Sequence, residues 1–142
     1  MSGELEPETH EEIQRLCGLG DELAEEQRYA EAIAEYQKAL RRVPEPLTDW
    51  DAATWILAAI GDAWFLSGDF ASARRTLASA MTCPEAVGNP FLHLRLGQAL
   101  FETQALDAAA DELIRAYMAA GAEIFEEEDP KYLAFLRTRA KL

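Results

Sequence analysis

Residues 16–39 read LCGLGDELAEEQRYAEAIAEYQKA and contain two short apolar patterns separated by a turn. The first pattern is Leu-x-x-Leu-Gly-x-x-Leu, which begins at Leu16, and the second is Ala-x-x-x-Tyr-x-x-Ala, which begins at Ala32. Apolar residues at positions i, i+3, i+4 and i+7 form one buried stripe along a helix. The stretch therefore predicts two helices that are joined by a turn and bury their stripes against each other.

The same pair of patterns recurs twice further along the chain. The second copy begins at Leu57 and continues at Ala73, and the third begins at His93 and continues at Ala109. Each first pattern carries a glycine in the middle of the predicted helix, and these are Gly20, Gly61 and Gly97. Glycine inside a helix costs roughly 1 kcal/mol relative to alanine. Its recurrence at one position predicts that the missing side chain makes room for the partner helix.

Caps and helix breakers divide the chain in agreement with these patterns. We expect helices over residues 10–26, 30–43, 49–66, 70–82, 90–103, 107–121 and 130–141. Thr9 and Thr48 each precede an acidic residue at the spacing of a capping box, and Asn89 and Asp129 each precede a proline suited to a first helical turn. The last helix has apolar residues on one side and basic residues on the other, as expected of a helix that closes a repeat array.

The pattern resembles the tetratricopeptide repeat family, which is built from helix-turn-helix units of 34 residues with a Leu-Gly pair, a small alanine, aromatics and a closing proline. The resemblance covers about residues 13–123 and implies an all-α fold, a right-handed α-solenoid of three antiparallel helical hairpins with a C-terminal capping helix. Successive mid-helix glycines are 41 and then 36 residues apart, whereas the family repeat is 34 residues. Seven extra residues, PEPLTDW, therefore lie in the first inter-repeat loop, and we expect a less regular surface near Trp50.

The resemblance predicts one domain over residues 1–142. Its parts are a flexible acidic N-terminus at 1–9, repeats at 10–46, 50–84 and 90–123, and a capping helix at 129–142.

In this family the first helices of successive hairpins line a concave groove in which a protein segment binds. By position relative to each glycine, the resemblance implies eleven partner-binding residues in such a groove. They are Gln14, Asp21, Glu25, Trp55, Asp62, Phe65, Phe91, Leu94, Arg95, Gln98 and Glu102. Cys17 and Ala58 occupy neighbouring groove positions.

Some relatives hold the C-terminal carboxylate of heat-shock chaperones with basic residues and asparagine in the groove. Only Arg95 fits that set, because Cys17, Asp21 and Phe91 stand where it would need Lys, Asn or another basic group. Unpaired acid in a groove repels a carboxylate. The sequence therefore disfavours chaperone-tail binding of that kind.

The net charge of the chain indicates which classes of partner it can bind. The chain has 26 acidic and 13 basic residues, a net charge of −13, and residues 1–49 alone have 13 acidic and 5 basic residues. Such a field repels nucleic-acid phosphates and anionic membranes and attracts basic proteins. With no secretory signal and no transmembrane stretch, we expect a cytoplasmic protein that binds another protein with a basic surface.

The sequence contains no pattern typical of an enzyme or of a cofactor or metal site. It has no glycine-rich phosphate loop, no HExxH and no paired cysteines with zinc spacing, since Cys17 and Cys83 lie far apart. We therefore predict no catalysis, no cofactor and no metal. His93 lies in an apolar stripe and is expected to be a packed core residue.

Three functional hypotheses follow from these observations. The leading one is sequestration of one specific protein, as an immunity protein sequesters a cognate bacterial toxin, because the chain is short, acidic and without a further domain. The alternative is a secretion chaperone, since the three-repeat chaperones of type III translocators are similarly short and acidic. A third is a structural scaffold that self-associates, which leaves both a monomer and a dimer open.

Overall fold

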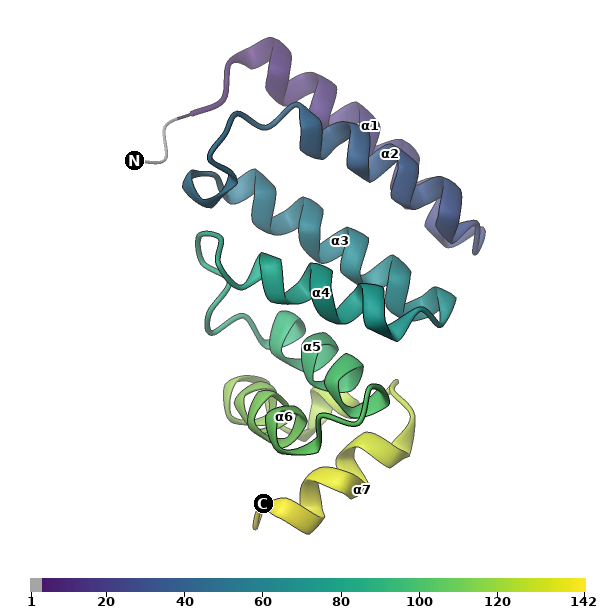
Figure 1. The fold of residues 1–142 in the computed structure, drawn as a ribbon, viewed down its shortest axis with the longest axis vertical. Coiled ribbons are helices and arrows are strands. Elements are labelled where there is room, and N and C mark those ends of the chain that lie inside the picture. The colour runs from purple at the N-terminus through teal and green to yellow at the C-terminus, as the bar shows by residue number, and fades with distance from the viewer. Residues whose placement is uncertain (1–3) are drawn as a thin grey trace. The chain divides into compact units, whose positions relative to one another are not determined.

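The computed structural model describes residues 4–142, which are helical apart from short turns and connections (Figure 1). Seven α-helices and two short 3-10 helices follow in chain order, and no strand occurs in this described part. They are α1 (Pro7–Glu25), α2 (Tyr29–Arg41), η1 (Leu47–Asp49), α3 (Asp51–Ser67), α4 (Phe70–Ala80), α5 (Pro90–Glu102), α6 (Leu106–Ala120), η2 (Ala122–Phe125) and α7 (Pro130–Arg139).

The helices confirm the predicted all-α fold of three helical hairpins followed by one more helix. All seven predicted helices are present, with ends within three residues of the expected positions. Two predicted caps are confirmed as well. The Asn89 carboxamide oxygen accepts a hydrogen bond from the Leu92 backbone N–H, and the Asp129 carboxylate accepts one from the Lys131 backbone N–H.

Both predicted capping boxes are wrong. Helix α1 begins at Pro7, whose ring already has the φ of a first helical turn, so Thr9 lies inside the helix. Thr48 lies within η1, and α3 begins only after Trp50, at Asp51. Residues 7–9 of the predicted flexible N-terminus are thus helical, while residues 1–3 lie outside the described residues.

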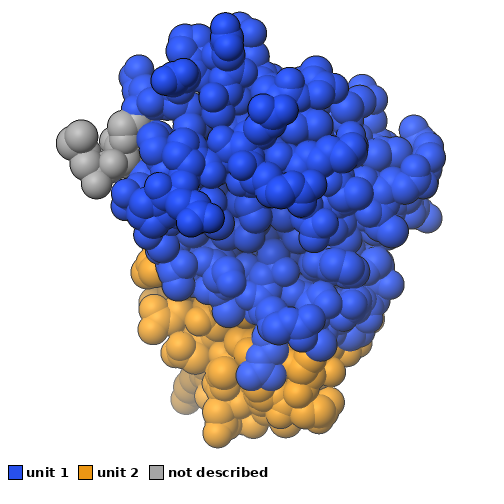
Figure 2. Space-filling model, turned by 45° about the horizontal axis from the view of Figure 1, so that its top comes forward, with its two compact units in different colours: residues 1–86 blue, residues 87–142 orange. Residues whose placement is uncertain are grey.

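The chain divides into two compact units, residues 1–86 and 87–142, which Figure 2 shows in different colours. In the first unit, α1 pairs with α2 and α3 pairs with α4, and α2 packs against α3 to join the two hairpins (Figure 1). In the second unit, α5 pairs with α6, and η2 and α7 pack onto this hairpin. The boundary between the units falls between the predicted second and third repeats.

The three mid-helix glycines lie where each hairpin's two helices meet. A Cβ on Gly20 would lie 2.5 Å from the Tyr36 ring, and one on Gly61 would lie 2.5 Å from Leu77 Cγ. A Cβ on Gly97 would lie 2.8 Å from Leu113 Cγ and 3.1 Å from the Leu113 backbone nitrogen. The distances under 3.0 Å are too short for real contacts, so each glycine makes room for a large side chain of the second helix.

Because Leu77 is fully buried, it cannot move aside for a new methyl group. We expect Gly61→Ala to lower the free energy of unfolding by about 1–3 kcal/mol, the usual cost of overpacking a core. Urea denaturation followed by circular dichroism measures this change.

Gly18 provides the matched control, because it lies in α1 but a Cβ there would meet no atom within 4 Å. Gly18→Ala should raise the free energy of unfolding by about 0.5–1 kcal/mol through helix propensity alone. If both variants gained stability, the close approach at Gly61 would not constrain the hairpin.

Candidate functional site: a hollow on the first unit and a closed face on the second

The first unit has a hollow of about 700 Å³ between the first half of α1 and the start of α3. Its lining is mostly apolar and comes from the N-terminal segment, α1, the residue before α3 and the first turns of α3. The lining residues are Glu4, Leu5, Pro7, His10, Ile13, Gln14, Cys17, Trp50, Asp51, Ala52, Trp55 and Ile56. This set is called the α1–α3 hollow below.

Apolar surface in the hollow is combined with carboxylates. Ile13 and Ile56 are buried and supply the hydrophobic wall, while Glu4 and Asp51 are exposed and acidic. Burial raises the pKa of the Cys17 thiol, and the negative charge of Asp21 raises it further. The thiol therefore stays neutral and adds to the apolar wall, and the hollow as a whole favours an apolar group accompanied by positive charge.

Trp55 is the most prominent predicted residue in this hollow. Its side chain is 67% exposed although it is large and apolar. Exposed large apolar groups beside a concavity are typical of protein-binding surfaces. Gln14, also predicted, is exposed in the same lining, so the structure brings Gln14, Cys17 and Trp55 together.

The other predicted residues of the first unit lie nearer the second halves of α1 and α3. Asp21 accepts a hydrogen bond of 2.6 Å from the Tyr36 hydroxyl, and burial together with this bond raises the pKa of the Tyr36 phenol. Glu25 is exposed and Asp62 is half-buried. Phe65 packs on Phe70 with 5.2 Å between the ring centres. None of these four predicted residues lines the hollow.

In the second unit, the predicted residues of α5 are closed off by the chain itself. Arg95 and Gln98 are buried, with exposed fractions of 7% and 0%. Arg95 Nη1 and Gln98 Nε2 each donate a hydrogen bond of 2.8 Å to the same carboxylate oxygen of Glu128. Arg95 also donates to Gln98 Oε1 at 2.7 Å. The one residue that fits the chaperone-tail set is thus already paired with an internal carboxylate.

Helix α7 engages the end of α5 in the same way. Glu102 accepts a hydrogen bond of 2.6 Å from the Tyr132 hydroxyl and forms an ion pair of 2.7 Å with Lys131. The Phe101 ring packs against Tyr132 and Phe135, with ring centres 5.5 and 5.0 Å apart. The expected apolar side of the last helix therefore faces the third hairpin.

Phe91 and Leu94 complete the predicted set. Leu94 is buried, and Phe91 is partly exposed with the Arg95 guanidinium carbon 5.2 Å from its ring centre. Of the five predicted residues on α5, only Phe91 offers substantial surface to a partner in this structure.

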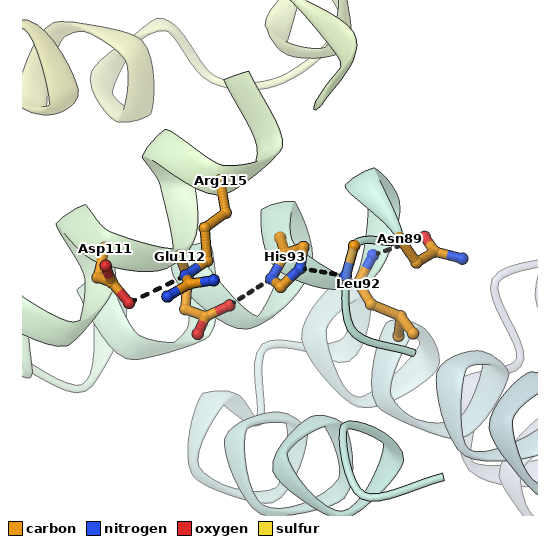
Figure 3. A network of polar contacts seen from close by, with 7 residues as sticks. Asn89, Leu92, His93, Asp111, Glu112 and Arg115 are labelled. Atoms are coloured by element: carbon orange, nitrogen blue, oxygen red, sulfur yellow. Dashed lines mark hydrogen bonds and ion pairs between the residues drawn. The ribbon is translucent and has the colours of Figure 1, made fainter. Parts of the chain in front are cut away.

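His93 is buried within a polar network that fixes its tautomer (Figure 3). Its Nε2 accepts a hydrogen bond of 2.8 Å from the Gly88 backbone N–H, so Nδ1 carries the proton and donates to Glu112 at 2.6 Å. Both ring nitrogens are thereby occupied by structural contacts. This arrangement agrees with the expectation that His93 is a packed core residue.

Sequence reasoning missed two features of these surfaces. Trp50 lines the hollow but was noted only as the end of an inserted loop, and nothing in the repeat pattern assigns a role to an insertion. Glu128 is the one residue of the acidic run 126–129 that pairs with Arg95. Its neighbours Glu126 and Glu127 are identical in type, so the sequence carries no signal that distinguishes them.

Residues 4–142 contain no group of three or more His, Cys, Asp or Glu side chains placed to hold a metal ion. No helix within this part of the chain combines the length and hydrophobicity needed to span a membrane.

Known proteins resemble this chain in structure rather than in sequence. No family model matches the sequence, and no curated protein matches it significantly. Among solved structures, the type III secretion chaperone SycD of Yersinia enterocolitica, in complex with a peptide of the translocator YopD, is similar with a TM-score of 0.70 and 15% identity. The match covers 96% of this chain and 95% of the SycD chain.

The first tetratricopeptide domain of Spaghetti (RPAP3), bound to an HSP90 peptide, is similar with a TM-score of 0.68 and 20% identity over 90% of this chain and 92% of that one. The first such domain of human RPAP3 has a TM-score of 0.66 and 20% identity over 89% and 88% of the two chains. At this level of identity the likeness establishes the fold.

Glu128 should stabilise the second unit because it satisfies two buried donors. We expect Glu128→Ala to lower the free energy of unfolding by about 1–3 kcal/mol, since the Arg95 and Gln98 donors lose their acceptor. Glu127→Ala, at an exposed position two residues before the helix cap, should change it by less than about 0.5 kcal/mol. Equal effects of the two variants in chemical denaturation would show that the Glu128 contacts add nothing to stability.

Proposed function

We propose that this chain, which has the tetratricopeptide-repeat fold, binds one protein partner through the α1–α3 hollow. The bound segment presents a large apolar side chain to the hollow and carries Lys or Arg beside it. The observation that carries the proposal is the 67% exposed Trp55 at the edge of an apolar hollow of about 700 Å³. A hollow of this size is within the range of sites that take several side-chain groups of a ligand.

Electrostatics favours a basic partner. The first unit, residues 1–86, has 17 acidic and 7 basic residues, a net charge of −10, whereas residues 87–142 have 9 and 6, a net charge of −3. The hollow thus lies on the strongly acidic unit, with Glu4 and Asp51 in its lining. Long-range attraction steers a basic partner towards this unit, and the apolar wall then supplies short-range affinity.

The biological role that we propose for this binding is sequestration in the cytoplasm, as an immunity protein neutralises a cognate toxin. A nucleic-acid-degrading toxin needs a basic surface for its substrate, and an acidic chain of this size is suited to cover such a surface. Most of the predicted residues on α5 are engaged within the chain, so the hollow is the main open apolar surface that the predicted residues provide. This favours the binding of one specific partner.

A translocator chaperone is the second candidate role. It is supported by the structural similarity to SycD, which extends over nearly the full length of both chains. The SycD structure was solved in complex with a peptide of the translocator YopD. The same hollow would then hold a segment of a secreted protein before export. The two roles differ in the partner, which is a toxin in the first and a secreted translocator in the second.

Selection from a display library of random peptides tests the chemistry of the hollow. We expect the selected peptides to share a large apolar residue within a few positions of Lys or Arg, because the lining is apolar and acidic. A consensus rich in Asp or Glu, or binding that requires a free C-terminal carboxylate, would contradict the proposed chemistry.

Trp55→Ala should weaken binding of the selected peptide by at least about 2 kcal/mol, the usual loss at a central interface aromatic. Isothermal titration calorimetry measures the affinity, and circular dichroism checks that the helices are retained. Met118→Ala is the matched control, because Met118 is a large apolar side chain with 78% exposure on α6, outside the hollow. Similar losses in the two variants would argue against binding at the hollow.

The association rate should fall steeply as salt rises from low concentration to about 0.5 M, where the screening length is only a few ångströms. Stopped-flow measurements with the selected peptide give this rate directly. An association rate that does not respond to salt would remove the electrostatic part of the proposal.

A further inference from the structure

Trp50 has the one buried side-chain nitrogen or oxygen atom, among the described residues, that has no hydrogen-bond partner. Its backbone is fully engaged, because its N–H donates to the Leu47 carbonyl at 3.1 Å and its carbonyl accepts from the Ala53 N–H at 3.1 Å. The indole N–H alone is unpaired. Trp50 is one of the residues that line the α1–α3 hollow.

An unpaired buried donor is costly, since it loses its bonds to water without replacement, at about 1–3 kcal/mol. Other buried polar groups in this unit are paired. Thr54, one helical turn into α3, donates its hydroxyl to the Pro84 carbonyl at 2.7 Å. The exception at Trp50 therefore calls for a specific explanation, and a functional role is one such explanation.

The inserted loop explains how Trp50 comes to this place. The first junction is seven residues longer than a standard repeat, and the insertion PEPLTDW ends on Trp50 itself. Within it, η1 (Leu47–Asp49) brings the chain to the start of α3, where Trp50 precedes the helix and is one of the lining residues of the hollow. The insertion thus adds to this surface an indole that a regular array would lack.

We propose that the Trp50 indole N–H is a specificity-determining donor of the hollow, which binds a neutral carbonyl oxygen of the partner segment. This inference rests on the proposed function. Glu4 and Asp51 in the same lining would repel a carboxylate, so a peptide carbonyl or a side-chain amide is the acceptor that fits. The N–H is buried in the free protein, so this hydrogen bond requires the indole or its neighbours to shift when the segment enters.

The indole N–H signals in a ¹H–¹⁵N correlation spectrum test this directly. The chain has three tryptophans and hence three such signals, and Trp50→Phe identifies that of Trp50 by its loss. On addition of the display-selected peptide, we expect the Trp50 signal to move downfield and its exchange with water to slow. A Trp50 signal that stays in place at saturating peptide overturns the inference.

The affinity of Trp50→Phe provides a second test, because this change removes the N–H and keeps an aromatic ring. We expect roughly three- to tenfold weaker binding of the same peptide, the effect of one net hydrogen bond. Met118→Ala, which changes an exposed side chain on α6 outside the hollow, is the control for an unspecific effect of substitution. Unchanged affinity of Trp50→Phe overturns the inference.

These results separate the inference from the proposed function. If the Trp55 signal moves and the Trp50 signal does not, the hollow binds the segment without the Trp50 hydrogen bond, and only the inference fails. If neither signal moves while peptide binds, the site lies elsewhere and the proposed function fails with it.

Discussion

The structure depends on one packing constraint, the contact between a mid-helix glycine and a large buried side chain of the facing helix. Gly20 with Tyr36, Gly61 with Leu77 and Gly97 with Leu113 repeat this contact in the three hairpins. It fixes how closely and in what register the two helices meet. The residues that then point away from the hairpin interface, such as Gln14 and Trp55, are placed by the same register.

Much of the fold could be predicted because the residues that make this contact recognisable lie close together in the sequence. A glycine with flanking apolar residues, a turn and an alanine-rich stripe identify each hairpin from sequence alone, and Asn89 and Asp129 mark helix starts that the structure confirms. The two threonine caps were wrong because Pro7 and the η1 turn set the helix starts instead. A local cap motif competes with such features, and sequence does not show which one prevails.

The candidate site was less predictable, because contacts distant in sequence decide which groove positions stay open. Arg95 and Glu128 are 33 residues apart, and their ion pair closes a face that repeat position alone would leave open. Trp50 comes from an insertion that the repeat pattern does not describe. Gln14 and Trp55, by contrast, lie on regular helices at regular repeat positions, and both line the hollow.

The two units consequently offer different surfaces. The first has an acidic, apolar hollow, whereas α5 in the second is engaged by its own C-terminal segment through Glu128, Lys131 and Tyr132. The Glu128 carboxylate also occupies Arg95, the one residue that fits the set with which some relatives hold a chaperone tail. This difference is our reason for proposing a binding site on the first unit.

Hydrogen–deuterium exchange of the full chain, with and without the display-selected peptide, tests that confinement most directly. We predict slower exchange on binding in residues 4–17 and 50–56, which supply the lining of the hollow, and unchanged exchange in α5 and α7. Protection confined to residues 87–142 would contradict a binding site on the first unit.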